Sequence, residues 1–316
     1  MMRLLITRPL PYAVIDAVHA GFDVTVRQEN TPLSGAEVAA ALAEFDAVLP
    51  TLGDRFDGES LAGTHRCKIL ANFGVGYNHI DVDAARAAGV IVTNTPGAVT
   101  DATADIALTL MLMTCRRAGE GERLVRSGQW TGWHPTQLLG MHMTGKRLGI
   151  VGMGRIGQAI AKRAHFGFGM DVVFFNRSPV TDLPFTATQL PDLEAVLKAA
   201  DVVVLAVPAT PQTHHLISGE ALDAMQRHAY LINIARGDVI DEAALIVALQ
   251  QGKIAGAGLD VYEFEPKVPD ALKAMDNVTL LPHLGTSALE VRTQMGLMAV
   301  DNLNAFLAGG EPPNTV

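Results

Sequence analysis

Short apolar runs rich in β-branched residues alternate along the chain with longer alanine-rich stretches, and this alternation is typical of a parallel α/β protein. The predicted strands fall into two groups. The first group lies before residue 95 and reads RLLIT, DVTV, AVLPT, KILANF and VIVTN. The second lies between residues 147 and 282 and reads RLGIVG, DVVFFN, DVVVLAV, YLINIA, AGAGLDVY and VTLLP. We therefore expect two parallel sheets with helices between their strands.

The same pattern predicts the helices that connect the two groups. A long apolar helix is expected to begin near Asp101, and a last helix is expected from about Ser287 to Leu307. Ser287 and Glu290 have the spacing of a capping box, in which two side chains satisfy N–H groups at a helix start. No low-complexity linker separates the groups. Ordered helices should therefore cross the domain boundary and let the C-terminal helix return to the first domain.

Composition supports two domains and limits the partners. With 316 residues, of which 49% are hydrophobic and 18% charged, the chain exceeds the roughly 250–300 residues at which single cores split. The net charge of −9 argues against a nucleic-acid partner, because neutralising phosphates needs clustered Lys and Arg. Any small anion must be bound by local groups.

Cysteine usage and the lengths of the apolar runs indicate the compartment. Only Cys67 and Cys115 are present, without a CxxC pair, so neither a disulfide framework nor a cysteine zinc site is expected. The N-terminal apolar run is too short for a signal peptide, and the longest apolar stretch, residues 106–115, is about half a membrane span. We expect a cytoplasmic protein without a membrane partner or a bound metal.

A glycine-rich loop follows the first strand of the second group. In RLGIVGMGRIGQAIAKRA the spacing Gly152-x-Gly154-x-x-Gly157 comes after a predicted strand and before a predicted helix. Glycines at these places permit a tight turn and let the backbone approach a pyrophosphate, while the helix N-terminus supplies N–H groups. The sequence therefore predicts a dinucleotide site.

The end of the next strand indicates which dinucleotide. Asn176 follows Gly152 by 24 residues, near the offset of about 20 at which an acidic residue would bind the adenosine ribose. The acid is absent, and Asn176, Arg177 and Ser178 stand there instead. These side chains can hydrogen-bond and pair with a 2′-phosphate, which favours NADP(H) over NAD(H). The alternative is that Arg177 is a solvated turn residue before Pro179.

Four chemically capable side chains follow later strands. Arg236 comes just after YLINIA and can clamp a carboxylate, and His283 follows VTLLP and can exchange a proton near neutral pH. Glu263 and Glu265 follow another strand, and either can orient an imidazole. Each is ordinary alone, but together they follow successive strands of one dinucleotide fold, where ligands gather.

The first group of strands contributes one further candidate. In ILANFGVGYNHID, a strand is followed by Gly74, Val75 and Gly76. Glycines let successive backbone N–H groups point inward as an anion nest, which suits a substrate carboxylate. The alternative is a flexible turn from strand to helix.

The sequence resembles the D-2-hydroxyacid dehydrogenase family over essentially its whole length. The stretches that carry the resemblance are NFGVGYNHID, VGMGRIGQAIAKRA, LINIARGDVIDEAAL, GLDVYEFEP and LPHLGTS, in the family's order and spacing. The resemblance implies a discontinuous, flavodoxin-like substrate-binding domain of residues 1–99 and 284–316 and an NADP-binding Rossmann domain of residues 100–283. It also implies an active site in the cleft between these domains and a homodimer formed mainly through the coenzyme domain.

The resemblance also assigns roles to individual residues. It implies that His283 is the general acid/base, Glu265 its partner and Arg236 the substrate clamp, with backbone donors from Val75 and Gly76 to the substrate carboxylate. Asp260 would hold the nicotinamide carboxamide. Further cofactor contacts are expected at Arg155, Ile156, Val207, Thr213 and Gly285.

Within the family, FFNRSP together with WTGWHPTQLLG looks most like the NADPH-dependent glyoxylate and hydroxypyruvate reductases. Trp133 would shape the substrate pocket of its own or of the partner subunit, or alternatively pack in the dimer interface. The expected reaction is the reduction of a small 2-oxo acid to a D-2-hydroxy acid. A 2-ketogluconate or aryl-pyruvate reductase of the same family and a dinucleotide-sensing regulatory protein are the alternatives.

Overall fold

The computed structural model describes all 316 residues, and the chain divides into two compact units. Unit 1 comprises residues 1–99 and 286–316, and unit 2 comprises residues 100–285. The family resemblance implied that residues 284 and 285 belong to the substrate-binding domain, which corresponds to unit 1, but the structure includes them in unit 2. None of the helices combines the length and the apolar character needed to cross a membrane.

Unit 1 is built on a five-stranded parallel sheet in the order β2-β1-β3-β4-β5. This is the doubly wound order of the flavodoxin-like folds, as expected from the family resemblance. The strands are short and largely buried, because helices cover both faces of the sheet. Their bounds are β1 Met2–Ile6, β2 Phe22–Val26, β3 Ala47–Leu49, β4 Ile69–Ala71 and β5 Ile91–Thr93.

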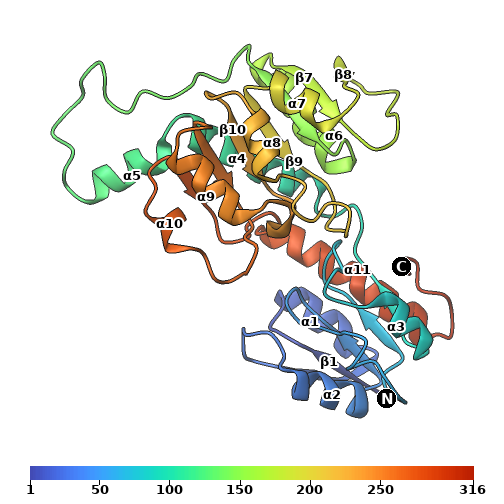
Figure 1. Cartoon of the computed structure of the whole chain (residues 1–316). Helices are drawn as coiled ribbons and strands as arrows, with labels where there is room; N and C mark the ends of the chain where they lie inside the picture. The colour runs from blue at the N-terminus through green and yellow to red at the C-terminus, as the bar shows by residue number, and fades with distance from the viewer. The chain divides into compact units, whose positions relative to one another are not determined.

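The alternation of side chains along β1 divides the core of unit 1 into two layers. Leu4 and Ile6 belong to the layer under α1 (Tyr12–His19) and α11 (Leu289–Leu307), whereas Leu5 belongs to the layer under α2 (Gly35–Glu44) and α3 (Val82–Ala87). In Figure 1 the red helix α11 lies beside α1 and the blue strands. The C-terminal helix thus returns to the N-terminal sheet.

The start of α11 differs from the sequence prediction. The helix begins at Leu289 behind an N-cap residue, Ala288, that has no side-chain cap. The amide of Ala288 donates to the carbonyl of Thr286 at 2.8 Å, so a tight turn delays the helix start. The hydroxyl of Ser287 accepts from Arg292 at 2.6 Å instead of capping. The predicted capping box is therefore wrong.

Unit 2 contains a seven-stranded parallel sheet in the order β12-β11-β10-β9-β6-β7-β8. The sequence pattern missed β8, because its residues Ala187–Gln189 form a short edge strand without an apolar run. The bounds of the other strands are β6 Arg147–Val151, β7 Asp171–Phe175, β9 Val202–Leu205, β10 Tyr230–Asn233, β11 Gly256–Leu259 and β12 Val278–Leu280.

Helices cover both faces of this sheet. One core layer lies under α4 (Thr100–Cys115) and α6 (Arg155–Phe168). The other lies under three helices on the opposite face, which are α7 Leu193–Ala199, α8 Gly219–Ala224 and α9 Glu242–Gln250. A 3-10 helix, η1 (Gly237–Val239), and a short helix, α10 (Asp270–Lys273), complete the unit.

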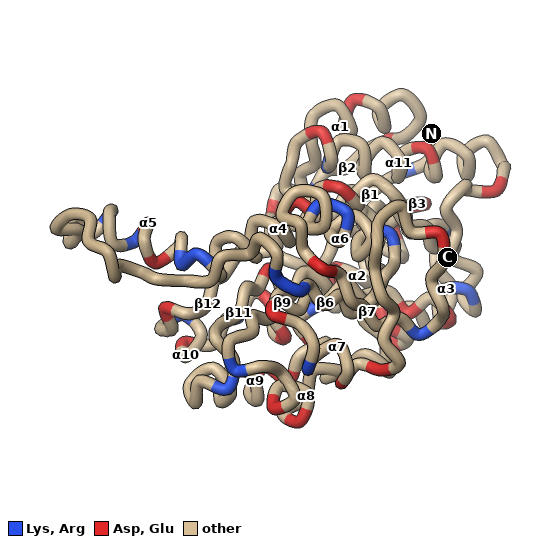
Figure 2. The backbone as a smooth tube through the Cα atoms, turned by 90° about the horizontal axis from the view of Figure 1, so that it is seen from above, with Lys and Arg blue, Asp and Glu red and all other residues tan.

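One segment of unit 2 extends away from its sheet, as Figures 1 and 2 show. This arm, residues 118–139, begins with α5 (Ala118–Arg126), which has no buried residue. The chain returns to α4 where the amide of Met141 donates to the carbonyl of Cys115 at 2.8 Å. Large apolar side chains of the arm are exposed, at Val125, Trp130, Trp133 and Leu139.

Candidate active site

The site residues that the sequence predicts in unit 2 follow the carboxyl ends of its parallel strands. Because all seven strands point the same way, these residues share one edge of the sheet. The chain runs outward from β6 through β7 to β8, and in the opposite direction from β9 through β12. Open α/β sheets bind their ligands at such a reversal of strand order, which here lies between β6 and β9.

The glycine loop sits at this reversal and is tightly packed. Gly152 has φ +98°, and a Cβ there would lie 2.7 Å from the carbonyl oxygen of Ala206 at the end of β9. At Gly157 a Cβ would lie 2.1 Å from the carbonyl oxygen of Gly152. Neither position accepts a side chain without moving backbone. Gly152 and Gly157 are therefore required by the fold of the loop.

Gly154 has a different environment that suits a ligand. It is the N-cap of α6, and a Cβ there would meet no atom within 4 Å. The first N–H groups of a helix have no partner within it, and here they belong to Arg155, Ile156 and Gly157. This free helix start with open space before it fits a pyrophosphate, since N–H groups and the helix dipole attract anions.

Asn176 has a structural role in the loop after β7. Its Oδ1 accepts from the amide of Met153 at 3.1 Å, and its Nδ2 donates to the carbonyl of Ser178 at 2.9 Å. Asn176 thus ties the glycine loop to its neighbour, which the sequence did not reveal. Arg177 and the hydroxyl of Ser178 are exposed and make no hydrogen bond or ion pair within the protein.

The loop after β9 closes on itself through Thr213. The hydroxyl of Thr213 accepts from the amide of Thr210 at 2.8 Å and donates to the carbonyl of Pro208 at 2.7 Å. Val207 lies against the glycine loop, because its Cγ1 would be 2.9 Å from a Cβ at Gly152. Both predicted cofactor residues therefore shape the loops at the reversal point.

The structure pairs Glu265, not Glu263, with His283. Oε2 of Glu265 lies 2.9 Å from Nδ1 of His283, while its Oε1 accepts from the amide of Tyr262 at 3.0 Å. Glu263 instead lies 2.9 Å from Nε2 of His215. Residue chemistry alone left these two glutamates as alternatives and the family resemblance implied Glu265, which is the glutamate that lies beside His283 in the structure.

One group of side chains has the spacing of a metal site. It consists of Glu263, His214 and His215, and one ligand atom of each lies within 4.8 Å of the others. The two imidazoles, however, stack at 4.0 Å with 23° between their planes. An imidazole nitrogen binds a metal ion that lies in the plane of its ring. Two stacked, nearly parallel rings cannot both have the same ion in their planes, so this group does not have the geometry of a metal site. The group instead links the loop after β9 to the segment after β11.

The surroundings of Glu265 favour its charged form. Burial raises the pKa of Glu265, but the hydrogen bond and charge of His283, the Tyr262 amide and the charge of Arg236 together bring it below its ordinary value. Burial lowers the pKa of Arg236, against the opposing charges of Glu265 and Asp238. A carboxylate and a guanidinium thus accompany His283 at the sheet edge.

Arg236 is positioned by the turn that follows β10. The side chain of Asn233 donates to the carbonyl of Arg236 at 2.8 Å and accepts from the amide of Ala235 at 3.0 Å. At Gly237 a Cβ would lie 1.8 Å from the backbone of Tyr262, so only glycine lets this turn approach the segment that carries Glu265. An Asn at the end of an apolar strand before a turn is the signal that could have identified Asn233.

Asp260 fixes the turn that carries His283. Its carboxylate accepts from the amides of Leu284 at 2.6 Å and Gly285 at 2.9 Å, and its carbonyl accepts from the amide of His283 at 2.9 Å. His283 has φ +54°, a conformation that non-glycine residues adopt rarely. The carbonyl of Gly285 also accepts from Thr103 at 3.2 Å. Asp260 is 1% exposed, and its contacts hold this strained turn.

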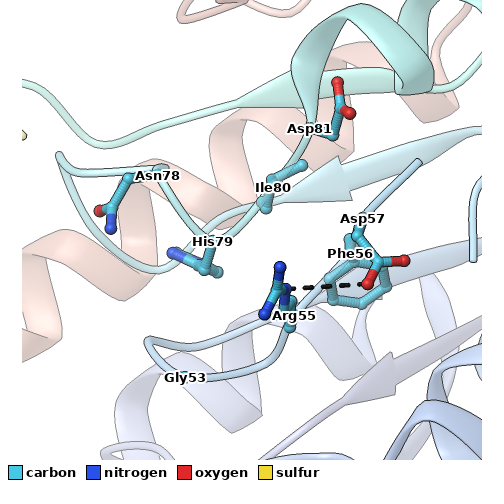
Figure 3. A pocket seen from close by; sticks show the side chains of 8 residues that line it. All are labelled: Gly53, Arg55, Phe56, Asp57, Asn78, His79, Ile80 and Asp81. Carbon is cyan, nitrogen blue, oxygen red and sulfur yellow. Dashed lines mark ion pairs between the residues drawn. The ribbon is translucent and has the colours of Figure 1, made fainter. Parts of the chain in front are cut away.

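In unit 1, Val75 and Gly76 lie in the loop after β4. Their backbone N–H groups make no hydrogen bond within the protein, as an anion nest requires. A pocket of about 420 Å³ opens beside this loop. Figure 3 shows its lining, which contains none of the residues to which the sequence assigned a role; the residues are Gly53, Arg55, Phe56, Asp57, Asn78, His79, Ile80 and Asp81. Trp133 lies on the arm of unit 2 and is 79% exposed.

Comparison with known proteins gives a consistent result. Residues 108–285 match the family model described as the NAD binding domain of D-isomer specific 2-hydroxyacid dehydrogenase. The chain is 42% identical to a glyoxylate reductase of Pyrococcus horikoshii, covering 99% of this chain and 95% of that protein. It is 43% identical to a glyoxylate reductase of Thermococcus onnurineus, with the same coverage.

Solved structures resemble the whole chain as well. An NADPH-dependent glyoxylate/hydroxypyruvate reductase from Sinorhizobium meliloti, in complex with NADP and malonate, aligns with a TM-score of 0.89 and 36% identity, covering 100% of this chain and 96% of that one. A protein from Thermus thermophilus aligns with a TM-score of 0.92 and 45% identity, covering 100% of both chains.

Proposed function

Because the chain belongs to the D-isomer specific 2-hydroxyacid dehydrogenase family, we propose that this oxidoreductase uses NADPH to reduce small 2-oxo acids, with glyoxylate and hydroxypyruvate as substrates and D-2-hydroxy acids as products. One observation carries the proposal. The paired His283 and Glu265 and the guanidinium of Arg236 share a sheet edge with a glycine loop built to receive a pyrophosphate.

In this proposal His283 supplies the proton. Its Nδ1 is held by Glu265, so Nε2 is the ring atom that donates to the ketone oxygen as it becomes a hydroxyl. The carboxylate of Glu265 stabilises the imidazolium before transfer. Arg236 holds the substrate carboxylate through its planar donors, and the N–H groups of Val75 and Gly76 donate to the same carboxylate.

NADPH would supply the hydride that adds to the carbonyl carbon. Arg155, Ile156 and Gly157 would bind the pyrophosphate at the start of α6. Val207, Thr213, Asp260 and Gly285 complete the proposed cofactor contacts. The preference for NADPH rests on Arg177 and Ser178, which are exposed beside Asn176 where an acidic residue would select NADH. The Sinorhizobium meliloti relative, solved with NADP, supports the same assignment.

We also propose that the protein is a cytoplasmic homodimer whose arm packs against a second copy. The arm exposes Trp130 (51%), Trp133 (79%) and Leu139 (66%), and aromatic side chains clustered on a projecting segment are typical of interfaces. Trp133 then either contributes to a substrate pocket or packs in the interface. Replacing it with Ala distinguishes these roles, since a pocket residue changes the ranking of substrates and an interface residue changes the oligomeric state.

The proposed function is tested by initial rates of NADPH and NADH oxidation with glyoxylate, hydroxypyruvate, pyruvate, 2-ketogluconate and phenylpyruvate. We expect turnover of glyoxylate and hydroxypyruvate with NADPH at a kcat/KM well above that with NADH. A preference for NADH would refute the role of Arg177. Tight NADPH binding without turnover of any of these acids would refute the proposed reduction and favour a regulatory protein.

A further inference from the structure

The loop that follows β4 is held by side-chain amides at three successive carbonyls. Nδ2 of Asn72 donates to the carbonyls of Gly74 and Gly76, both at 3.0 Å. Nδ2 of Asn94 donates to the intervening carbonyl of Val75, also at 3.0 Å. Asn72 is 0% exposed, so its hydrogen bonds are shielded from water and define the loop conformation.

These carbonyl contacts determine where two N–H groups point. A peptide unit is planar and trans, so the carbonyl of one residue and the N–H of the next point in opposite directions. The Gly74 carbonyl accepts from Asn72 and also from the backbone amide of Thr95 at 3.1 Å, and these two contacts together set the direction of the Val75 N–H. In the same way, the contact from Asn94 to the Val75 carbonyl sets the direction of the Gly76 N–H.

His79 fixes the orientation of the Asn72 amide. An amide can present either its oxygen or its nitrogen to a neighbour. Nε2 of His79 lies 3.0 Å from Oδ1 of Asn72, and because Nδ2 must face two carbonyls, this Nε2 carries the donated proton. His79 lies on the wall of the pocket in Figure 3, in the segment between β4 and α3. The loop after β4 is thus held by a chain of hydrogen bonds that begins at His79.

We propose that Asn72, oriented by His79, is a positioning residue for substrate binding, which aims the Val75 N–H at the carboxylate of the 2-oxo acid, and that Asn94 aims the Gly76 N–H in the same way. This inference rests on the proposed function, because it gives the two N–H groups a carboxylate to bind. It assigns no step of proton or hydride transfer to the three side chains. Their loss should therefore weaken substrate binding and leave the chemical step and NADPH binding unchanged.

Two substitutions remove the contacts with little change in shape. Asn72→Asp replaces the donating nitrogen with an oxygen that repels the carbonyls of Gly74 and Gly76. His79→Leu removes the donor that orients Asn72, and His79→Gln restores an N–H at the position of Nε2. Since a hydrogen bond to a charged group contributes about 10- to 100-fold in affinity, we expect Asn72→Asp and His79→Leu to raise the KM for glyoxylate by that factor. His79→Gln should restore it to within about threefold of wild type.

His65→Leu is the matched control, because His65 is a half-buried histidine of the same unit whose Nε2 makes no hydrogen bond to the loop. Its KM should stay at the wild-type value. Calorimetric titration of the NADPH complex with oxamate, a 2-oxo acid analogue, gives a readout independent of turnover and should show the same loss of affinity. The Kd for NADPH and the kcat should stay within about threefold of wild type in all variants.

The outcomes separate the inference from the proposed function. Wild-type KM and oxamate affinity in folded Asn72→Asp and His79→Leu proteins would overturn the inference and leave the proposed function standing. If Asn72→Asp does not fold, the contrast between His79→Leu and His79→Gln decides the question. A wild-type enzyme that reduces no 2-oxo acid and binds no oxamate would overturn the proposed function, and the inference with it.

Discussion

Nδ1 of His283 lies 2.9 Å from Oε2 of Glu265, and the other oxygen of that carboxylate accepts from the amide of Tyr262. Both carboxylate oxygens are therefore held, and the imidazole ring cannot turn without losing its partner. Nε2 of His283 is the ring atom left for a substrate. This arrangement, in which a fixed carboxylate orients a histidine, underlies the first two predictions.

The first prediction concerns proton donation by His283. Replacing His283 with Ala should lower kcat for glyoxylate reduction by about 10²- to 10⁴-fold, the usual contribution of a positioned general acid. The Kd for NADPH, measured by the fluorescence of the bound nicotinamide, should change less than about threefold. A comparable loss of turnover and of NADPH binding would show that His283 supports the fold of the site rather than the reaction.

The second prediction concerns the pH dependence of stability through Glu265. Because its pKa in the folded protein is below the ordinary value, the ionised carboxylate stabilises the fold above about pH 4.3, the pKa of an exposed Glu. This contribution disappears as the pH falls through the lowered pKa. Glu265→Gln lacks the titrating group. The difference in free energy of unfolding between wild type and Glu265→Gln should therefore be largest near neutral pH and shrink in acid.

Urea unfolding of both proteins at a series of pH values, followed by circular dichroism, measures this difference. Carboxylates remote from Glu265 titrate equally in the two proteins and cancel in the comparison, whereas Asp260, whose pKa the charge of Glu265 raises, is part of the measured difference. A difference that stays constant down to pH 3 would show that the pKa of Glu265 is not lowered by folding.

The fold was largely predictable because apolar strands and glycine positions are local signals. The two groups of strands and the helix near Asp101 follow directly from periodicity. The edge strand β8 did not, because Ala187–Gln189 is stabilised by pairing with β7 rather than by its own side chains. The start of α11 was missed for a similar reason, since a backbone turn at Thr286, and not a capping side chain, determines it.

The site was predictable only for residues whose type indicates chemistry. Arg236, His283 and the glutamates are recognisable in the sequence. The choice of Glu265 over Glu263 came from the family resemblance, because the residues alone do not show where two loops meet. Asn72 and Asn233 were not predicted, because their amides bind backbone groups of nearby loops. The residue type alone does not distinguish an asparagine with such contacts from one without them.

The third prediction concerns the coenzyme preference. Arg177→Asp should lower kcat/KM for NADPH by about 10- to 100-fold, because an ion pair with the 2′-phosphate is replaced by repulsion. The value for NADH should change little. Arg227→Asp is the control, because Arg227 is also exposed but precedes β10 and so lies at the opposite end of the sheet. An equal loss with both coenzymes would contradict the proposed contact.

The fourth prediction concerns the return of the C-terminal helix to unit 1. A Cβ at Gly296 in α11 would lie 2.3 Å from Cγ2 of Val14 in α1, and Val14 is 0% exposed. A β-branched side chain has little rotamer freedom in a helix, so the two helices must separate to admit even a methyl group. Gly296→Ala should therefore destabilise the protein by about 1–3 kcal/mol, the usual cost of overpacking, although alanine is the better helix former.

Gly167→Ala in α6 is the matched control, because a Cβ there meets no atom within 4 Å. It should stabilise the protein by about 0.5–1 kcal/mol through helix propensity alone. Adding Val14→Ala to Gly296→Ala should relieve the clash. The loss in free energy of unfolding of the double variant should therefore be smaller than the sum of the losses of the two single variants. Strict additivity in urea unfolding would mean that α11 does not pack on α1 at Gly296, and that the C-terminal helix contributes to unit 1 through other contacts.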